Sequence, residues 1–295
     1  MQRTAIVIPT YNAMPQLAAT LAELAWAESR DDVEVVLADS GSRDATLSHV
    51  KARAPWATVV RGDQSMWWAA ATNIGCRHAI AALGCETLCL LNHDCEMPEH
   101  SFDVLVQGHR QTRRDIVCSR VLVKHSDRVL FAGGGMAWTG MLTMPGFDAP
   151  AMSRFASREV VWCGGMGVIF SAALWLRLGG FDAATFPHYL ADSDFCLRAR
   201  HAGARVRYLD DAEIVNDRAS TGLQVTPGDA SVRRLFGTFV SPRSPYRLAG
   251  VLRFYRRHLG ARWPLAVAHL YAIHVGVSLK RIAAARVQRR ASLAP

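Results

Sequence analysis

The chain has 295 residues, of which 50% are hydrophobic and 20% charged, and its formal net charge is +9. This composition is ordinary for a globular protein with a sizeable core, and the length allows one large α/β domain or two small ones. The seven cysteines are scattered through apolar segments, so reduced thiols are expected and a disulfide scaffold is excluded. The first residues run directly into an apolar strand, so no secretory signal peptide is expected.

The positive charge is concentrated at the C-terminal end. Residues 231–295 contain thirteen Lys and Arg and no Asp or Glu, whereas residues 1–230 contain the other 21 basic and all 25 acidic side chains. This asymmetry indicates an acidic partner surface, either a membrane or a nucleic acid.

Apolar strands and helical patterns alternate over the first 100 residues. Strands are expected at 4–8, 33–38, 58–61 and 87–91, with helices after Pro15, from 45 to 53, and around Asn73 and Gly75. This alternation is typical of a parallel, doubly wound α/β sheet. No Walker loop or Gly-x-Gly-x-x-Gly segment follows the first strand, so P-loop and Rossmann dinucleotide sites have no support.

The strand at 87–91 ends abruptly in Asn92-His93-Asp94. In open α/β sheets ligands bind beyond the carboxyl ends of the strands, so Asp94 is well placed for a ligand. A hard carboxylate oxygen there suits Mg²⁺ or Mn²⁺ bridging a diphosphate, although Asp94 could also simply cap the turn. Zinc on Cys85, Cys89, His93 and Cys95 is excluded, because a strand rising about 3.3 Å per residue would separate the outer two by roughly 30 Å.

Four segments resemble, in order and spacing, the nucleotide-sugar half of family 2 glycosyltransferases: IVIPTYN, LADSGSRD, ATNIGCRHA and LLNHD. The resemblance implies a GT-A type α/β fold with a doubly wound, mostly parallel sheet and a C-terminal helical extension. It implies a catalytic domain over 1–230, with a nucleotide-sugar half at about 1–125 and an acceptor half at about 126–230. The charge and the helical pattern of the remaining residues predict a basic, amphipathic helical tail over 231–295. It assigns donor binding to Pro9, Thr10, Tyr11, Asn12, Asp39, Ser40, Asp63, Asn73 and Asn92.

The resemblance also implies a divalent cation site. The family's acidic motif reads Asp-x-Asp, or Asn-x-Asp in many bacterial members, which Asn92-His93-Asp94 resembles. A later family segment has a His beside the metal, and the matching position here is Asn216, a weaker ligand. The expected ligands of Mg²⁺ or Mn²⁺ are therefore Asp94, Asn92 and Asn216.

The segment that contains Asp192 resembles the family's catalytic-base segment, Gly-Gly-Phe-Asp followed by Glu-Asp-x-Asp-Leu-Cys-Leu-Arg. The resemblance makes Asp192 the catalytic base and Asp194 its neighbour on a helix, while Ala191 replaces the family's Glu. Taken without the resemblance, two acidic residues in a first helical turn also suit the helix dipole.

An acceptor site is expected between these motifs. Residues 125–159 are rich in Gly, Met and Pro, which is typical of a functional flap or a poorly ordered loop. A strand from Val160 to Phe170 then returns to the site, and its glycines allow a sugar to approach closely or form a strand bulge. Trp67, Trp68 and Trp162 can stack on sugars or belong to the core. The expected acceptor-binding residues are Trp162, Gly164, Gly165 and Asp194.

The tail is expected to be helical from Tyr246. Its apolar run at 265–279 has about 15 residues, short of the roughly 20 that span a bilayer. It therefore suits a helix lying in the membrane interface, or one packed on the catalytic domain or on a second subunit as a homodimer.

These observations predict an inverting, metal-dependent glycosyltransferase. It would move a sugar from a nucleoside diphosphate sugar to a hydroxyl of a glycan or lipid-linked acceptor, in cell-surface polysaccharide synthesis. It would be cytoplasmic and peripheral on the inner face of the cell membrane. The alternative is a catalytically silent relative acting as a membrane-associated scaffold, since Ala191 and Asn216 replace family residues. Nucleic acid is not an expected partner, because the apolar stripe of the tail suits lipid or protein better.

Overall fold

The computed structural model describes residues 2–144, 158–217, 225–226 and 229–291, and the chain divides into two compact units. The sheet unit contains residues 1–135, 144–187 and 191–220, and the helical unit contains 136–143, 188–190 and 221–295. The helical unit thus includes two short segments from the middle of the chain, which no composition shift marks.

The first half of the sheet unit contains the predicted parallel strands. They are β1 (Thr4–Thr10), β2 (Val33–Asp39), β3 (Thr58–Arg61) and β4 (Thr87–Leu90). Their order is β4-β1-β2-β3, and every neighbouring pair is parallel. β1 and β4 are buried throughout, which explains their unbroken apolar sequences. β1 runs two residues further than predicted, because Pro9 and Thr10 continue the ladder beside Ala38 and Asp39.

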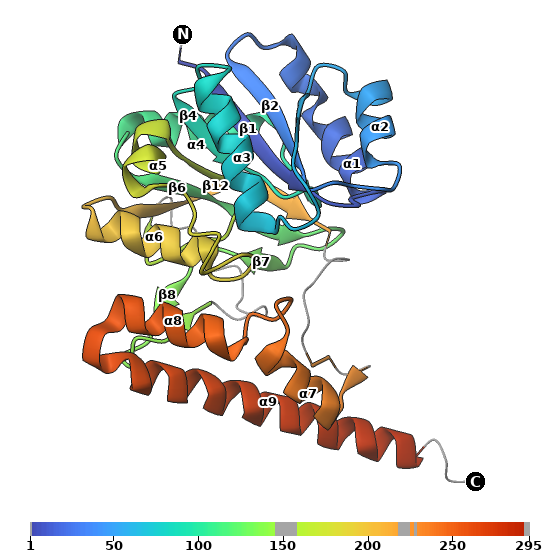
Figure 1. Cartoon of the computed structure of the whole chain (residues 1–295), viewed down its shortest axis with the longest axis vertical. Helices are drawn as coiled ribbons and strands as arrows, with labels where there is room; N and C mark the ends of the chain where they lie inside the picture. Colours follow the sequence, from blue (N-terminus) through green and yellow to red (C-terminus); the bar gives the residue numbers. More distant parts are fainter. Residues whose placement is uncertain (1, 145–157, 218–224, 227–228, 292–295) are drawn as a thin grey trace. The chain divides into compact units, whose positions relative to one another are not determined.

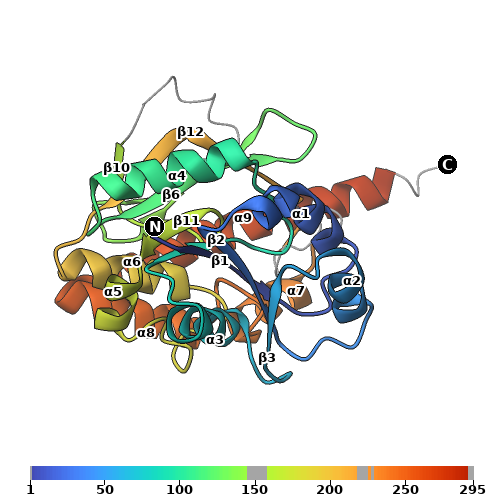
Figure 2. The same cartoon turned by 90° about the horizontal axis from the view of Figure 1, so that it is seen from above.

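Helices cover both faces of this sheet, as Figure 2 shows. One face packs against α1 (Gln16–Glu23), η1 (Leu24–Ser29), α2 (Thr46–Arg53) and α4 (Glu99–Gln111). The other carries α3 (Trp68–Ala81), α5 (Ala172–Leu178) and α6 (Ala191–His201). α3 lies close to β1 because Gly75 faces the strand, where an added Cβ would stand 2.6 Å from Val7 Cγ1. The predicted doubly wound α/β architecture is confirmed.

The second half of the sheet is mixed (Figure 1). Its strands are β5 (Cys95–Glu96), β6 (Ile116–Val123), β7 (Val129–Phe131), β10 (Arg158–Val160), β11 (Val168–Ser171) and β12 (Val206–Asn216). The order continues from β4 as β11-β6-β12-β10, in which β6 and β12 are parallel and β11 is antiparallel to both neighbours. β5 pairs with β12, and β7 pairs with β6.

The prediction of one strand from Val160 to Phe170 is wrong. The segment forms two strands on different parts of the sheet, since β10 pairs with β12 while β11 lies between β4 and β6. The glycine-rich residues 164–167 connect them, and Gly167 has a φ of 65°, which ends any extended run.

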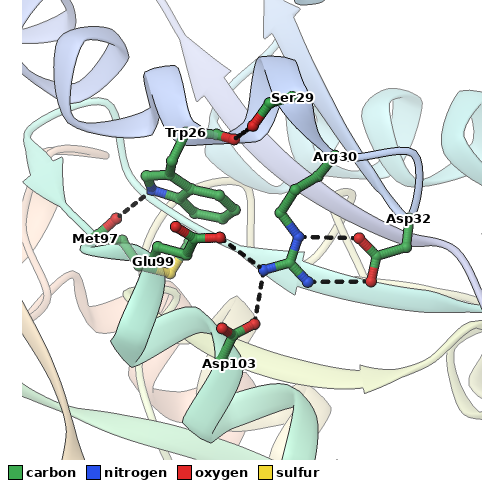
Figure 3. A network of polar contacts seen from close by, with 7 residues as sticks. All are labelled: Trp26, Ser29, Arg30, Asp32, Met97, Glu99 and Asp103. Carbon is green, nitrogen blue, oxygen red and sulfur yellow. Dashed lines mark hydrogen bonds and ion pairs between the residues drawn. The ribbon is translucent and has the colours of Figure 1, made fainter.

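A polar network lies at the amino-terminal end of β2, and Figure 3 shows its residues. Arg30 pairs with Asp32 at 3.0 Å, with Asp103 at 2.8 Å and with Glu99 at 3.2 Å, so it joins the start of β2 to α4. The Arg30 guanidinium lowers the pKa of the Asp32 carboxyl. Trp26 Nε1 donates to Met97 O at 3.2 Å in the same network. A shared guanidinium with three partners is more stabilising than a single exposed pair.

The helical unit contains α7 (Val232–Val240), α8 (Leu248–Leu259), η4 (Gly260–Arg262) and α9 (Trp263–Ala291), with the short pair β8 (Gly135–Met136) and β9 (Leu142–Thr143) at its border. Polar bonds join these elements: Leu142 N donates to Tyr255 Oη at 3.0 Å, and Thr139 Oγ1 bonds His269 Nδ1 at 2.8 Å. The predicted helical tail is confirmed. Among the described residues, no helix has the length and hydropathy needed to cross a bilayer.

Candidate functional site

The carboxyl ends of three parallel strands meet at one edge of the sheet unit. Thr10 at the end of β1 pairs with Asp39 at the end of β2, and Val7 of β1 pairs with Leu90 at the end of β4. The loops that follow these strands, which contain most of the predicted donor-binding residues, therefore lie side by side.

Two predicted donor-binding residues are used to build these loops. The fully buried Asp39 carboxylate accepts hydrogen bonds from Gly41 N at 3.0 Å and Ser42 N at 3.1 Å. Asn12 has a φ of 45°, and its Oδ1 accepts from Arg43 N at 2.9 Å. Asp39 thus orders its own loop after β2, and Asn12 joins the β1 loop to the β2 loop. The contact of either side chain with a donor stays a prediction.

The other predicted residues of this edge differ in exposure. Pro9, Thr10 and Ser40 are buried, and Ser40 N donates to Thr10 O at 2.8 Å. Tyr11 is 47% exposed. The Asp63 carboxylate is exposed and accepts from Ser65 N at 2.8 Å, and the Ser65 hydrogen bonds lower its pKa. Tyr11 and Asp63 therefore remain open to a ligand.

Asn73 has a framework role that the sequence did not predict. Its Nδ2 donates to Phe181 O at 2.7 Å, and its Oδ1 accepts from Phe181 N at 2.9 Å. Both ends of the buried amide thus hold the Gly180–Phe181 turn to α3. A direct contact between Asn73 and the donor stays a prediction.

Asp94 and Asn216 lie together, as expected for a shared site. Asn216 Nδ2 donates to the Asp94 carbonyl oxygen at 3.3 Å and contacts Cys95 Sγ at 3.2 Å. Burial raises the pKa of the Asp94 carboxyl, and the charge of His93 and the Asn216 hydrogen bond oppose that rise. In the part of the chain that the structure describes, no Lys or Arg forms an ion pair with Asp94.

This setting fits a hard divalent cation that arrives with its ligand. Within the described ranges no three His, Cys, Asp or Glu side chains form a metal-binding group. The available donors are the Asp94 carboxylate and the Asn216 amide oxygen, while Asn92 lies two residues from Asp94. Mg²⁺ and Mn²⁺ are commonly held by one or two protein oxygens and by phosphate oxygens of the substrate, which matches this incomplete set.

Asp192 lies in the first turn of α6, as predicted, and faces the glycine-rich loop. A Cβ on Gly164 would stand 3.6 Å from Asp192 Oδ2, and Ser193 N donates to Asp192 Oδ1 at 2.7 Å. Burial raises the pKa of Asp192 to about 6, and hydrogen bonds from Ser193 and from the Gly165 backbone only partly oppose the shift. A carboxylate with this pKa is suited to take up a proton near neutral pH.

Asp194 is used differently from its neighbour. It is fully buried and pairs with Arg198 Nε at 2.7 Å, and Arg198 also donates to Leu178 O and Gly180 O, each at 2.8 Å. The Asp194 carboxylate thus holds Arg198, which anchors α6 to the turn after α5. Acceptor binding by Asp194 stays a prediction with no support from this geometry.

The remaining predicted acceptor residues lie on the segment between β10 and β11. Trp162 packs against Phe131, with ring centroids 5.3 Å apart, and lies over Gly134. Gly164 and Gly165 are buried beside Asp192 and Trp68. An added Cβ on Gly165 would stand 2.3 Å from Trp68 Cζ2, so this close approach requires glycine.

The sequence did not decide whether Trp68 belongs to the site or to the core. Its Nε1 donates to Asn92 Oδ1 at 3.0 Å, which places it against the predicted metal motif. The sequence offered only the Trp67-Trp68 pair as a signal, and that pair is equally typical of a core.

Comparison with known proteins identifies the architecture. A model of glycosyl transferase family 2 matches residues 5–172, which is more than half of the chain. No curated protein matches the chain. Since the match covers all strands of the nucleotide half, the GT-A type fold expected from the sequence is confirmed.

Solved structures share the fold at low identity. GalNAc-T7 with UDP, GalNAc and Mn²⁺ has a TM-score of 0.61 and 15% identity, over 83% of this chain and 50% of that chain. The mannosyltransferase PcManGT from Pyrobaculum calidifontis, with GDP-Man and Mn²⁺, has a TM-score of 0.54 and 19% identity, over 99% of this chain and 88% of that chain. S. aureus TarS has a TM-score of 0.53 and 15% identity, over 88% of this chain and 44% of that chain. The chain spans about half the length of GalNAc-T7 and less of TarS.

Proposed function

Because the chain belongs to glycosyl transferase family 2 and is a glycosyltransferase, we propose that it moves a sugar from a nucleoside diphosphate sugar to a hydroxyl of a glycan or lipid-linked acceptor. The proposed reaction is metal-dependent and inverting, and serves cell-surface polysaccharide synthesis. The observation that carries the proposal is the pair of reactive carboxylates in the sheet unit: Asp94 lies beside Asn216, and Asp192 lies against a glycine loop.

Asp192 acts as the general base in this proposal. As the acceptor hydroxyl attacks the anomeric carbon, its proton must move to a nearby group. A pKa of about 6 leaves Asp192 ionised at neutral pH and still basic enough to accept that proton. Gly164 adds no side chain beside the carboxylate, since a Cβ there would stand 3.6 Å from Asp192 Oδ2, and we expect the acceptor hydroxyl to approach on this side.

Asp94 and Asn216 hold the divalent cation. When bound, Mg²⁺ or Mn²⁺ neutralises charge on the departing diphosphate as a Lewis acid. The Asp94 carboxylate has no cationic side chain paired with it among the described residues, so a metal ion is a suitable counter-charge. GalNAc-T7 and PcManGT, which share the fold, were each solved with Mn²⁺ and a nucleotide or nucleotide sugar, which supports the same cofactor class here.

Inversion follows from the use of one carboxylate on the acceptor side. A retaining reaction by double displacement needs a second carboxylate as nucleophile. The nearest carboxylate along α6, Asp194, is fully buried and paired with Arg198, so it is not available to attack a sugar. Direct displacement by the acceptor, assisted by Asp192, inverts the anomeric centre.

The proposed location is the cytoplasmic face of the cell membrane. On α7, Val232, Phe236 and Val240 are spaced four residues apart on one side of the helix and are 42%, 68% and 73% exposed. Residues 231–295 supply thirteen positive charges and no negative ones. An exposed apolar stripe with surrounding cations suits the interface of an anionic bilayer. The alternative is that this exposed apolar surface forms a homodimer interface through the C-terminal helices.

We expect the intact protein to co-sediment with anionic liposomes at low salt, and to be partly released at high salt. Phe236→Ser should weaken this binding, whereas the matched control Leu176→Ser removes an exposed apolar side chain (57%) from α5 and should leave it unchanged. If the protein ignores anionic liposomes and sediments as a dimer that Phe236→Ser dissociates, the surface is a dimer interface.

The decisive experiment for the activity is a screen of nucleotide sugars by thermal shift, with and without Mn²⁺. The best donor is then incubated with the enzyme and a candidate acceptor, and free nucleoside diphosphate is measured. Metal-dependent release supports the proposal. Stabilisation without any release across acceptors would favour the alternative of a silent, membrane-associated scaffold, for which the specific observation is that Ala191 stands where family members have Glu.

A further inference from the structure

Trp68 connects the two sides of the candidate site. It is the first residue of α3 and is half-buried. Its indole Nε1–H donates to Asn92 Oδ1 at 3.0 Å, while its ring faces Gly165. The preceding residue, Gly164, lies beside Asp192, since a Cβ there would stand 3.6 Å from Asp192 Oδ2. One side chain therefore touches both the metal motif and the loop that contacts the base.

The ring contacts fix the direction in which the indole N–H points. Trp68 Cζ2 occupies the space that a Cβ on Gly165 would need, at 2.3 Å. On another side the Phe181 ring meets the indole edge-on, with centroids 5.3 Å apart and planes at 76°. Because these contacts restrict the ring, the N–H is held toward Asn92 instead of turning freely.

This donor determines which end of the Asn92 amide is left for a ligand. An indole N–H can only donate, so it selects the amide oxygen of Asn92 as its acceptor. The Nδ2 amine then faces away from Trp68. In the described part of the chain it has no protein acceptor, and it is not among the enclosed polar atoms. Asn92 therefore presents two N–H donors to the edge of the sheet.

We propose that Trp68 is a positioning residue that turns Asn92 into a hydrogen-bond donor for an oxygen of the nucleoside diphosphate, and not a ligand of the cation. The inference rests on the proposed function, because it names the substrate group that Asn92 contacts in that site. The sequence had placed Asn92 among both the metal ligands and the donor-binding residues, and this inference keeps only the second role. Cation binding then depends on Asp94 and Asn216.

The closing experiment measures binding of UDP, GDP and dTDP to the full chain in the presence of Mn²⁺ by calorimetry. In Asn92→Asp the N–H donors are lost and a negative charge faces the phosphates, so affinity should fall about tenfold or more. A cation ligand would behave in the opposite way, since a carboxylate binds Mn²⁺ better than an amide does.

Trp68→Phe keeps the ring and removes only the N–H, so the freed Asn92 amide should bind the diphosphate about three- to tenfold more weakly. The matched control is Trp175→Phe, because the buried Trp175 Nε1 has no hydrogen-bond partner among the described residues. The affinity of this variant for the diphosphate should equal that of the wild type. If Trp68 acts through Asn92, adding Trp68→Phe to Asn92→Ala should cause no further loss.

The outcomes separate this inference from the proposed function. If the wild-type protein binds none of the three diphosphates with Mn²⁺, the proposed function fails and this inference fails with it. If the wild type binds but Asn92→Asp binds as tightly or more tightly, only the role of Asn92 as a donor is overturned. Should Trp68→Phe not fold, as judged by circular dichroism, Asn92→Asp alone decides.

Discussion

The proposed donor side and the proposed base side of the candidate site each contain a pair of aspartates, and the two members of each pair have different partners. Near the strand ends Asp39 is bonded to the backbone of its own loop, whereas Asp94 has a raised pKa and no ion pair with Lys or Arg among the described residues. On the base side Asp194 is paired with Arg198, whereas Asp192 has a pKa raised to about 6. In both places, one carboxylate is satisfied by protein partners, and burial raises the pKa of the other.

The difference separates the two carboxylates proposed to be functional from the two that hold the framework. All four aspartates lie at or just beyond the end of a strand or in the first turn of a helix, and all four belong to segments that resemble family motifs. Only the partners separate them: full hydrogen bonding or an ion pair stabilises the charge of Asp39 and Asp194, while burial penalises the charge of Asp94 and Asp192. Stored electrostatic cost of this kind is typical of functional groups.

The largest effect is expected for Asp94→Ala. The variant should lose metal-dependent donor binding altogether, because Asn216 alone offers a neutral amide to the cation. Calorimetry with Mn²⁺ and the donor measures this directly. Folding should be retained, since Asp94 lies beyond the end of β4. Unchanged donor affinity in the presence of Mn²⁺ would place the cation elsewhere.

Asp192→Asn should lower turnover by about 10² or more, the usual scale for loss of a general base, while donor affinity stays near that of the wild type. The initial rate of diphosphate release and the donor affinity are measured on the same preparation. Near-normal transfer by Asp192→Asn would remove it as the base. Asp194→Asn is not a silent control here: it leaves Arg198 without its carboxylate partner, and its loss should appear as destabilisation.

The pH profile of kcat/KM should show an acidic limb near pH 6, because Asp192 must be ionised to accept a proton. Since the folded pKa lies above the unfolded value near 3.8, the folded state binds more protons between these values, and stability falls as pH rises from about 4 to 6. Asp192→Asn should therefore be more stable than the wild type at pH 7, by about 1 to 3 kcal/mol. Denaturant unfolding at pH 4 and pH 7 tests both statements.

The smallest effect is expected for Asp39→Ala, which concerns only the framework. It leaves Gly41 N and Ser42 N without their acceptor, so the free energy of unfolding should fall by about 1 to 3 kcal/mol. Chemical denaturation measures the change. A variant that unfolds like the wild type but binds the diphosphate donor far more weakly would show that Asp39 belongs with the reactive carboxylates.

Much of the fold was predictable from the sequence because continuous apolar runs mark buried parallel strands. The strands expected at 4–8 and 87–91 occur as β1 and β4, and both are buried throughout. The break between β10 and β11 was not, because both halves are apolar and only their partner strands distinguish them.

The chemistry of the site was predictable to the level of residue type and no further. Motif resemblance located Asp94, Asn216 and Asp192, and the structure places Asn216 against Asp94. The bonds that commit Asn73 to Phe181 join residues 108 positions apart, and those from Trp68 to Asn92 join residues 24 apart. No local pattern records such pairings, since they depend on how separate strands and helices meet.

The turn from Leu178 to Phe181 is bonded from two helices, by Arg198 of α6 and by Asn73 of α3. Such double anchoring makes the turn, the start of α3 and the first part of α6 open together, if they open at all. In native-state hydrogen exchange, the amides of these three segments should share one opening free energy and respond together to Asn73→Ala. The same anchoring leaves little freedom for insertions at this turn. Insertions and deletions in related proteins should therefore occur at other surface positions of the sheet unit than this turn.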